Sequence, residues 1–433
     1  MEVLVGTIIH STWDNPMVIM DKSALGIQNN KIVFICSSDE LHDVKQKYGF
    51  SEDSISRFDK GEFIMPGFID THIHASQYVN AGKGLDLPLL CWLNQYTFPS
   101  EARFSNIDYA EKVYDKVVRR VLMNGTTTAS YFATNHRAAS LKLCQVIARY
   151  GQRAFVGKVC SNQNSPSYYI ENTEEAVAES ESFIKGVQAM KNDLITPVVT
   201  PRFAISCSFQ LLQALGKLKD TYNLPVQSHL SENKEECKQV KKLFPDSAHY
   251  VDVYRKSNLL GPQTVMAHAI HICDEELEVL KRTETGVSHC PNSNMSICSG
   301  LCDVRRLLEK NIKVGLGTDV AGGYHPSMLN AIRLTIITSK LISLDRPESY
   351  KYINYKEAFR MATLGGAKDD RTGNFQVGKD FDAIIINPTC PDGPVDIFPE
   401  DTLENRVEKF IHLGDDRNIK QVFVAGQKVW PRD

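Results

Sequence analysis

The 433-residue chain has no apolar run near the roughly 18 residues that a membrane-spanning helix needs. It has no block of basic residues, and its formal net charge is only -3. We therefore expect a small-molecule partner, with no nucleic-acid or membrane partner. The first residues, Met1-Glu2-Val3-Leu4-Val5, carry neither the positive charge nor the long apolar stretch of a secretory signal peptide.

The eleven cysteines show no disulfide pattern. They are scattered, their number is odd, and a chain of this length does not need disulfides to stabilise its core. We expect reduced thiols in a cytoplasmic protein. Apolar content of 42% and charged content of 23% are ordinary for a globular protein.

Strand-like and helix-like segments alternate through the middle of the chain. A short apolar strand precedes His72, and seven further strand-like runs occupy residues 126–130, 154–157, 195–199, 225–229, 264–268, 286–289 and 313–319. Amphipathic segments such as 108–123, 173–191 and 301–308 separate them. About eight strand–helix alternations predict an α/β fold of the (β/α)8 barrel type. The two ends differ, because 3–9, 32–35, 383–386 and 422–429 all read as strands, with a turn at Asn29-Asn30.

The tripeptide His72-Ile73-His74 is the strongest single signal for chemistry. It follows the apolar pair Phe68-Ile69, which is bounded upstream by Pro66-Gly67. Residues two apart on a strand project to the same side, so His72 and His74 aim two imidazoles at one point. Two convergent imidazoles form half of a divalent metal site.

Other predicted strands end in residues that complete such a site. One ends in His229, with Glu232 three residues later, the next ends in His268, and the last ends in Asp319. In barrels of this type the active site lies at the carboxyl ends of the strands. The economical assignment is a single metal held by His72, His74, His229 and Asp319.

The remaining groups at the strand ends then take other roles. His268 would orient the attacking water, and Glu232 would carry a proton from that water to the substrate. Zinc suits the ligand set, although iron binds similar sets. His289 also ends a strand, but no role follows from its position, and we treat it as structural. Lys158 is treated in the same way.

Five stretches together resemble the amidohydrolase superfamily, in particular its branch of mononuclear purine and pyrimidine deaminases. They are Pro66–His74, Ser228–Glu232, Ala267-His268, Ser288–Asn294 and Gly317–Asp319. The resemblance implies one zinc ion per chain, a homodimer, and a small β-sandwich built from both chain ends. It therefore predicts sandwich segments at 1–65 and 375–433 and a hydrolase barrel at 66–374.

Three further stretches resemble the guanine-deaminating members of that branch. They are His74–Tyr78, Asp86–Leu93 with Tyr96–Pro99 after it, and Thr200–Phe203. The expected reaction converts guanine to xanthine and ammonia, with Glu232, His268 and Asp319 as catalytic residues. Either Glu232 or Asp319 would protonate the leaving amine. The substrate would contact Gln77, Trp92, Leu93, Arg202, Phe203, His229, Glu232 and Asp319.

The chemistry of the base agrees with these contacts. Arg202 offers a fork of donors for a carbonyl oxygen, and the Gln77 amide can pair with a base edge. Phe203 and Trp92 can wall a flat ring, and Leu93 can close its apolar side. Read without the resemblance, both aromatic residues suit a core, and Arg202 suits pairing with an acidic neighbour.

Two alternatives remain open at this point. One is a related amidohydrolase acting on another amino-azine, such as cytosine or a triazine, and the other is a catalytically dead barrel that serves as a scaffold. The deaminases that carry a Pro-Cys-x-x-Cys motif are disfavoured, because Cys290-Pro291 has the inverse order and no paired cysteine follows it.

Overall fold

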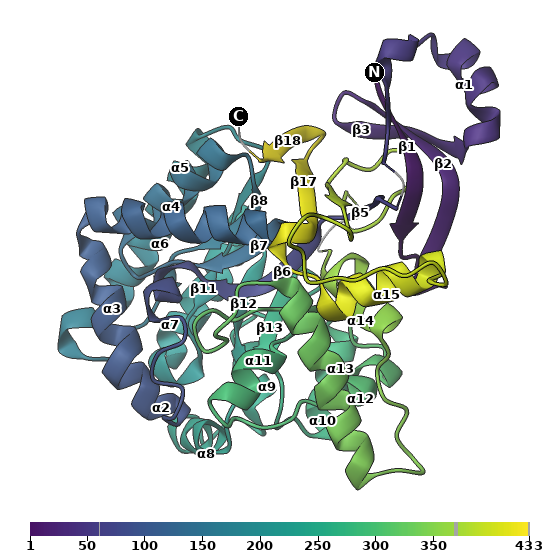
Figure 1. Ribbon diagram of the computed structural model, residues 1–433. Helices are drawn as coiled ribbons and strands as arrows, with labels where there is room; N and C mark the ends of the chain where they lie inside the picture. Colours follow the sequence, from purple (N-terminus) through teal and green to yellow (C-terminus); the bar gives the residue numbers. More distant parts are fainter. Residues whose placement is uncertain (60, 368–370, 432–433) are drawn as a thin grey trace.

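Eight parallel strands form a barrel in the computed structural model, which describes residues 1–59, 61–367 and 371–431 (Figure 1). The barrel strands are β6 (Phe68–His74), β7 (Thr126–Phe132), β8 (Arg153–Gly157), β10 (Ile195–Pro197), β12 (Val226–Leu230), β13 (Thr264–His268), β14 (Gly286–His289) and β15 (Val314–Leu316). Short extensions, β9 (Val159–Cys160) and β11 (Thr200–Pro201), continue β8 and β10. The predicted (β/α)8 barrel is confirmed.

Two four-stranded sheets make up the barrel, with orders β10-β8-β7-β6 and β12-β13-β14-β15. A parallel bridge between Val199 and Val226 joins them on one side. On the other side, the backbone N–H of Asp319 donates to the carbonyl of His72, and that of His74 donates to Val320. The first and last strands therefore meet at the residues expected to carry chemistry.

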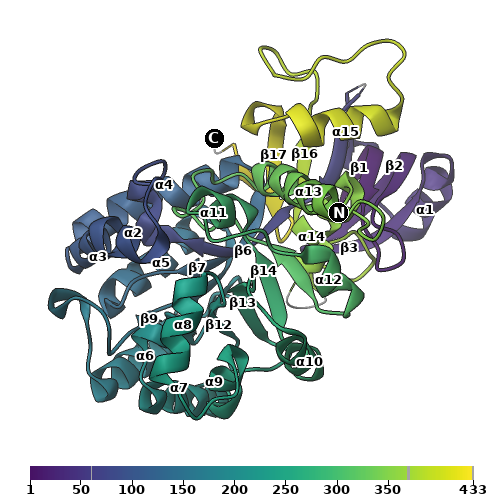
Figure 2. The same cartoon turned by 90° about the horizontal axis from the view of Figure 1, so that it is seen from below.

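Helices surround the barrel, most of them along its outside, as Figures 1 and 2 show. They are α2 (Leu89–Trp92), α3 (Phe98–Ala102), α4 (Ile107–Met123), α5 (Arg137–Tyr150), α6 (Thr173–Ala189), α7 (Phe209–Tyr222), α8 (Lys234–Leu243), α9 (Tyr250–Lys256), α10 (Asp274–Arg282), α11 (Pro291–Ser296), α12 (Val304–Glu309), α13 (Met328–Asp345) and α14 (Tyr355–Ala362). Among the residues described, none of the helices is both long and apolar enough to cross a membrane.

The helix α4 illustrates why these segments are helical. Asn106 caps its first turn by accepting a hydrogen bond from the backbone N–H of Tyr109. Val113, Val117 and Val121 recur every four residues and are buried against the barrel. This apolar stripe is the pattern that predicted a helix over 108–123.

Strands from both ends of the chain form one further sheet. Its order is β18-β17-β16-β5-β1-β2-β3, and β4 also pairs with β1. The bounds are β1 (Glu2–His10), β2 (Val18–Gln28), β3 (Lys31–Ser37), β4 (Ile55–Arg57), β5 (Phe63–Pro66), β16 (Ala383–Ile386), β17 (Ile419–Val424) and β18 (Gln427–Trp430). The helices α1 (Leu41–Tyr48) and α15 (Leu403–Leu413) accompany it.

Alternating side chains of β1 pack into two separate apolar clusters. Leu4 joins Leu25, Ile64 and Phe423, which come from both ends of the chain. Val3 belongs to the other cluster, on the opposite face. The expected association of the two chain ends is thus confirmed, while the domain limits at 65 and 374 stay a prediction.

One terminal segment differs from its prediction. Residues 422–429 are not one strand, because β17 and β18 form a hairpin. Ala425 and Gly426 form its turn with φ of 46° and 74°. Two consecutive residues with positive φ are typical of the tight turns that join antiparallel strands. Ala425 gives no sequence signal for such a turn, because alanine rarely adopts this conformation.

His10 on β1 is expected to make the terminal sheet sensitive to acid. Burial, with the nearby charge of Lys379, lowers the pKa of His10 from 6.5 to about 4. Its neutral form therefore contributes stability that is complete above pH 6.5 and lost as the pH falls toward 4. Lowering the pH from 7.5 to 5 should reduce the free energy of unfolding of the wild type by about 2 kcal/mol more than that of His10→Leu. Denaturant unfolding at the two pH values measures this difference, and equal losses in both proteins would contradict it.

Candidate active site

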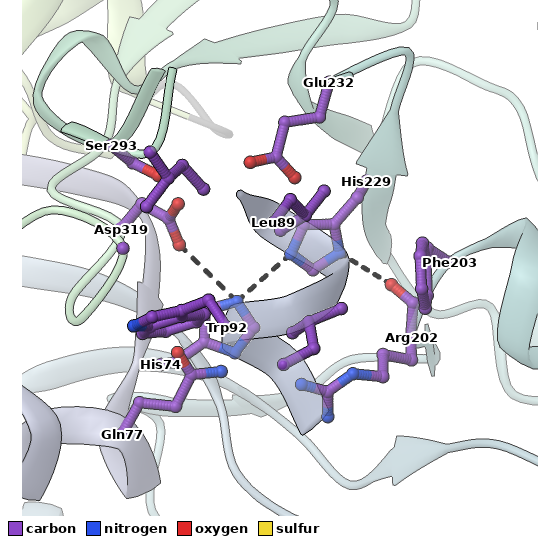
Figure 3. Close-up of a pocket in the computed structure, with 13 residues that line it drawn as sticks. His74, Gln77, Leu89, Trp92, Arg202, Phe203, His229, Glu232, Ser293 and Asp319 are labelled. Atoms are coloured by element: carbon purple, nitrogen blue, oxygen red, sulfur yellow. Dashed lines mark hydrogen bonds and ion pairs between the residues drawn. The ribbon is translucent and has the colours of Figure 1, made fainter. Parts of the chain in front are cut away.

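The residues predicted to act in catalysis, metal binding or substrate binding meet at the carboxyl ends of the barrel strands, around a cavity of about 400 Å³ (Figure 3). The cavity is lined by His74, Gln77, Leu89, Trp92, Leu93, Arg202, Phe203, His229, Glu232, Ser293, Ile297, Asp319 and Gly322. Every residue expected to contact substrate is in this set. His72 and His268 are not, and both are buried.

Three imidazoles and one carboxylate converge at one end of the cavity. Asp319 Oδ1 lies 3.1 Å from His72 Nε2 and 3.5 Å from His74 Nε2. His74 Nε2 lies 3.1 Å from His229 Nε2. A tetrahedral zinc site with bonds of about 2.0–2.1 Å puts its ligand atoms about 3.3 Å apart. These four side chains therefore have the chemistry and spacing to hold a metal ion.

The free nitrogen of His72 agrees with this interpretation. His72 Nε2 is buried and makes no hydrogen bond within the part of the chain that the structure describes, although Asp319 Oδ1 lies 3.1 Å from it. A buried polar atom without a partner is costly. A metal ion would use the Nε2 lone pair that the protein leaves unpaired.

A backbone carbonyl sets the orientation of His229. Its Nδ1–H donates to the carbonyl oxygen of Arg202 at 2.6 Å. The hydrogen bond fixes the neutral tautomer, so the Nε2 lone pair faces the cluster. Burial lowers the pKa of His229 well below its usual range, and the neighbouring histidines His72 and His74 add to the effect. A neutral imidazole is the form that binds metal.

A second buried carboxylate, Asp70, ties the first and last barrel strands together. It accepts hydrogen bonds from the backbone N–H of His72 at 3.2 Å and of Thr318 at 3.0 Å, and from the Thr318 hydroxyl at 2.5 Å. Burial raises its pKa to about 6. Asp70 thus sets the position of His72 relative to Asp319, the residue after Thr318.

Glu232 and His268 face Asp319 from the other side of the cluster. His268 Nε2 lies 3.5 Å from Glu232 Oε2 and 3.8 Å from Asp319 Oδ2. The Nδ1–H of His268 donates to Asn294 Oδ1 at 2.9 Å, which leaves the Nε2 lone pair toward the two carboxylates. These three groups therefore surround the space where a reacting water would lie.

The surroundings of Glu232 favour its protonated form. Burial raises its pKa well above the usual range, the charges of Asp319 and Glu236 raise it further, and a hydrogen bond from Ser299 opposes the shift. The backbone N–H of Glu232 donates to Glu236, which also caps α8. A buried carboxylic acid held beside a reaction site can act as a proton carrier.

The backbone is in an unusual conformation at three of these positions. Ser231, His268 and Asp319 have φ values of 48°, 75° and 46°. Such values cost a non-glycine residue free energy, and they are common where function requires a side chain to point in a set direction. Ser231 directly precedes Glu232, and His268 and Asp319 carry reactive groups themselves.

The far end of the cavity holds the groups expected to recognise a base. Arg202, Gln77, Trp92, Leu93 and Phe203 all line it, and the indole N–H of Trp92 donates to the carbonyl of Lys83. Arg202 also forms a buried ion pair, which was the alternative interpretation of this residue. The ion pair agrees with that alternative, while contact between Arg202 and a substrate stays a prediction.

The sequence reasoning missed several residues around the cavity. Leu89 and Ile297 carry no signal that separates them from ordinary core residues. Ser293 lies within the motif at 288–294 and Gly322 follows the motif at 317–319, but no chemistry singles them out. Glu101, the partner of Arg202, was also missed. His289, treated as structural, is fully buried and does not line the cavity.

Several known proteins resemble this chain over most of its length. The Amidohydrolase family model matches residues 63–429. A guanine deaminase of Pongo abelii is 48% identical over 98% of this chain and 96% of its own length. A guanine deaminase of Homo sapiens is 47% identical over the same shares. The crystal structure of guanine deaminase from C. acetobutylicum with guanine bound in its active site superposes with a TM-score of 0.93, at 38% identity, covering 99% of this chain and all of that one.

Metal content distinguishes the four proposed ligands from His268. After loading and dialysis, we expect roughly one divalent ion per wild-type chain and less than about a tenth of that in His72→Ala, which loses a ligand. His268→Ala should keep roughly one ion, because this imidazole is not one of the four proposed ligands. Plasma mass spectrometry measures the content, and circular dichroism confirms that each variant is folded. An equal loss in His268→Ala would instead assign His268 to the ligand set.

Proposed function

The chain belongs to the amidohydrolase family, and on that premise we propose that it deaminates guanine by hydrolysis, giving xanthine and ammonia. One observation carries the proposal: a single cavity joins the His/Asp cluster to Arg202, Gln77 and two aromatic walls. The near-full-length similarity to guanine deaminases supports the same substrate and argues against another amino-azine. The complete set of reactive side chains argues against a dead scaffold.

Guanine complements the far end of the cavity. Arg202 would donate to its carbonyl oxygen, and the Gln77 amide would pair with a base edge. Phe203 and Trp92 would hold the two faces of the ring, and Leu93 its apolar side. These contacts would turn the carbon that bears the amine toward Glu232 and Asp319.

The proposed cofactor is one zinc ion per chain, held by His72, His74, His229 and Asp319. The chemistry of this donor set and the unpaired nitrogen of His72 support the proposal. Zinc bound there would lower the pKa of a water molecule toward neutrality and so supply a nucleophile.

The protein's own groups then move the protons. His268 and the second oxygen of Asp319 would orient the water for attack on the ring carbon. Glu232 would protonate the ring nitrogen beside that carbon, which makes the carbon more electrophilic, and would take a proton from the water. The raised pKa of Glu232 supports this role. Glu232 or Asp319 would deliver the last proton to the leaving amine.

The reaction can be followed by the ultraviolet absorbance of guanine. We expect zinc-loaded wild type to form xanthine and Glu232→Gln to lose roughly 100- to 10,000-fold in kcat, because glutamine cannot carry the proton. Adenine and cytosine should be turned over far more slowly. The matched control is Glu235→Gln, three residues further on and exposed on α8, which should keep wild-type activity. Full activity in Glu232→Gln would refute the assigned role, and no turnover of guanine by the metal-loaded wild type would refute the substrate.

We also propose a cytoplasmic location and a homodimer. All eleven cysteines are free, six of them exposed or half-buried and five buried, and unpaired thiols suit a reducing compartment. Ile337, Leu341 and Leu344 are exposed and follow one another along one face of α13. An exposed apolar face of this kind suits an interface between two copies of the chain.

Light scattering tests the assembly directly. The wild type should have twice the mass of one chain, and Leu341→Glu combined with Leu344→Glu should shift it toward the single-chain mass. Val377→Glu, which alters an exposed apolar residue elsewhere, should leave the mass unchanged. A wild-type protein with the mass of one chain would contradict the dimer.

A further inference from the structure

Glu101, on α3, lies behind the cavity and does not line it. Its side chain is fully buried, and its carboxylate accepts hydrogen bonds from three other side chains. Arg202 Nη1 donates to Oε2 at 2.7 Å, and Arg202 Nη2 donates to Oε1 at 3.3 Å. Gln77 Nε2 donates to Oε1 at 3.0 Å, and the Tyr169 hydroxyl donates to Oε2 at 2.6 Å. Two donors meet each oxygen, which fills the accepting capacity of the group.

This arrangement fixes the orientation of Arg202. The two hydrogen bonds to Glu101 form the paired geometry that holds a guanidinium plane most firmly. The guanidinium also lies over the ring of Phe98, 5.2 Å from its centroid. The guanidinium has five N–H donors, and only two are used by Glu101, so the others remain for a ligand in the cavity.

The same carboxylate fixes the amide of Gln77. A carboxylate only accepts hydrogen bonds, so the atom of Gln77 that faces Glu101 must be the nitrogen. The amide oxygen then points the other way, where the backbone N–H of Ala321 lies 3.5 Å from it. Gln77 therefore presents an acceptor to the cavity, while Arg202 presents donors.

We propose that Glu101 is the positioning residue that sets this donor and acceptor pattern and so selects a purine with a carbonyl group. The inference rests on the proposed function. Guanine offers a carbonyl oxygen to Arg202 and ring N–H groups to Gln77. In a purine with an amine in place of the carbonyl, the N–H donors of the amine would face the N–H donors of Arg202. Buried polar groups would then be left unpaired. Glu101 touches neither the substrate nor the reacting atoms, and acts through its two neighbours.

The substitution Glu101→Gln tests the inference with little change of shape. It removes the charge that offsets Arg202 and puts an N–H2 group among the donors. We expect KM for guanine to rise roughly 10- to 100-fold while kcat stays within about threefold, because the groups that carry protons are untouched. Steady-state kinetics on the zinc-loaded enzyme measures both constants.

Competitive inhibition gives a readout that general loosening of the fold would not produce. Hypoxanthine keeps the carbonyl of guanine, whereas purine lacks it, and neither carries the amine. Wild type should bind hypoxanthine more tightly than purine, and Glu101→Gln should lose most of that preference. A purely structural defect would weaken both inhibitors alike and would overturn the inference.

A buried ion pair elsewhere provides the matched control. Glu171 pairs with Lys158 at 2.5 Å, and both side chains are buried, but neither residue lines the cavity. Glu171→Gln should therefore leave KM and the inhibitor preference unchanged. If Glu101→Gln does not fold, Tyr169→Phe removes one donor from the same carboxylate and keeps its charge. That variant should raise KM by roughly 2- to 10-fold with the same loss of preference.

The outcomes separate the two proposals. In the first case, wild type deaminates guanine, and KM and the inhibitor preference stay at wild-type values in Glu101→Gln. The same result in Tyr169→Phe counts if Glu101→Gln does not fold. Glu101 then has no positioning role, and the proposed function stands. If metal-loaded wild type leaves guanine unchanged, the proposed function fails and the inference fails with it.

Discussion

The site depends on one buried carboxylate, Asp70, because the metal-binding set is divided between the first and last strands of the barrel. Asp70 accepts hydrogen bonds from the backbone of His72 and from both the backbone and the side chain of Thr318. These residues are far apart in sequence, and only closure of the barrel brings them together. A shift of one residue between β6 and β15 would turn the imidazoles away from Asp319. The fold and the ligand set are thus fixed by the same three hydrogen bonds.

Arg202 connects this cluster to the recognition end of the cavity. Its carbonyl oxygen orients His229, while its guanidinium pairs with Glu101. A displacement of the segment after β11 would therefore disturb both ends of the cavity together. This coupling explains why the segment is held by a buried ion pair, even though such pairs add little net stability. The ion pair matters for geometry, because it holds both the guanidinium and the backbone carbonyl of Arg202 in place.

The barrel strands could be predicted from apolar runs that alternate with amphipathic segments, and period-two spacing predicted the common direction of His72 and His74. His72 and His74 point the same way because they are two apart on a strand, and His229, His268 and Asp319 follow from the rule that barrel sites lie at the carboxyl ends. Two features could not be predicted in this way. The hairpin between β17 and β18 turns at Ala425, a residue with no turn preference. Glu101 lies on a short helix about a hundred residues before Arg202, and no local pattern shows which distant cation a buried glutamate will meet.

Glu101 and Glu232 show why residue type alone could not assign these roles. Both are buried glutamates near the same cavity. Glu101 accepts hydrogen bonds at both oxygens, including two from a guanidinium, so it acts as a fixed acceptor. Glu232 accepts one hydrogen bond from a neutral hydroxyl and faces Asp319, so burial and like charge raise its pKa and favour proton transfer. The number and charge of the surrounding donors decide whether a buried carboxylate positions a substrate or reacts with it, and only the folded chain supplies those donors.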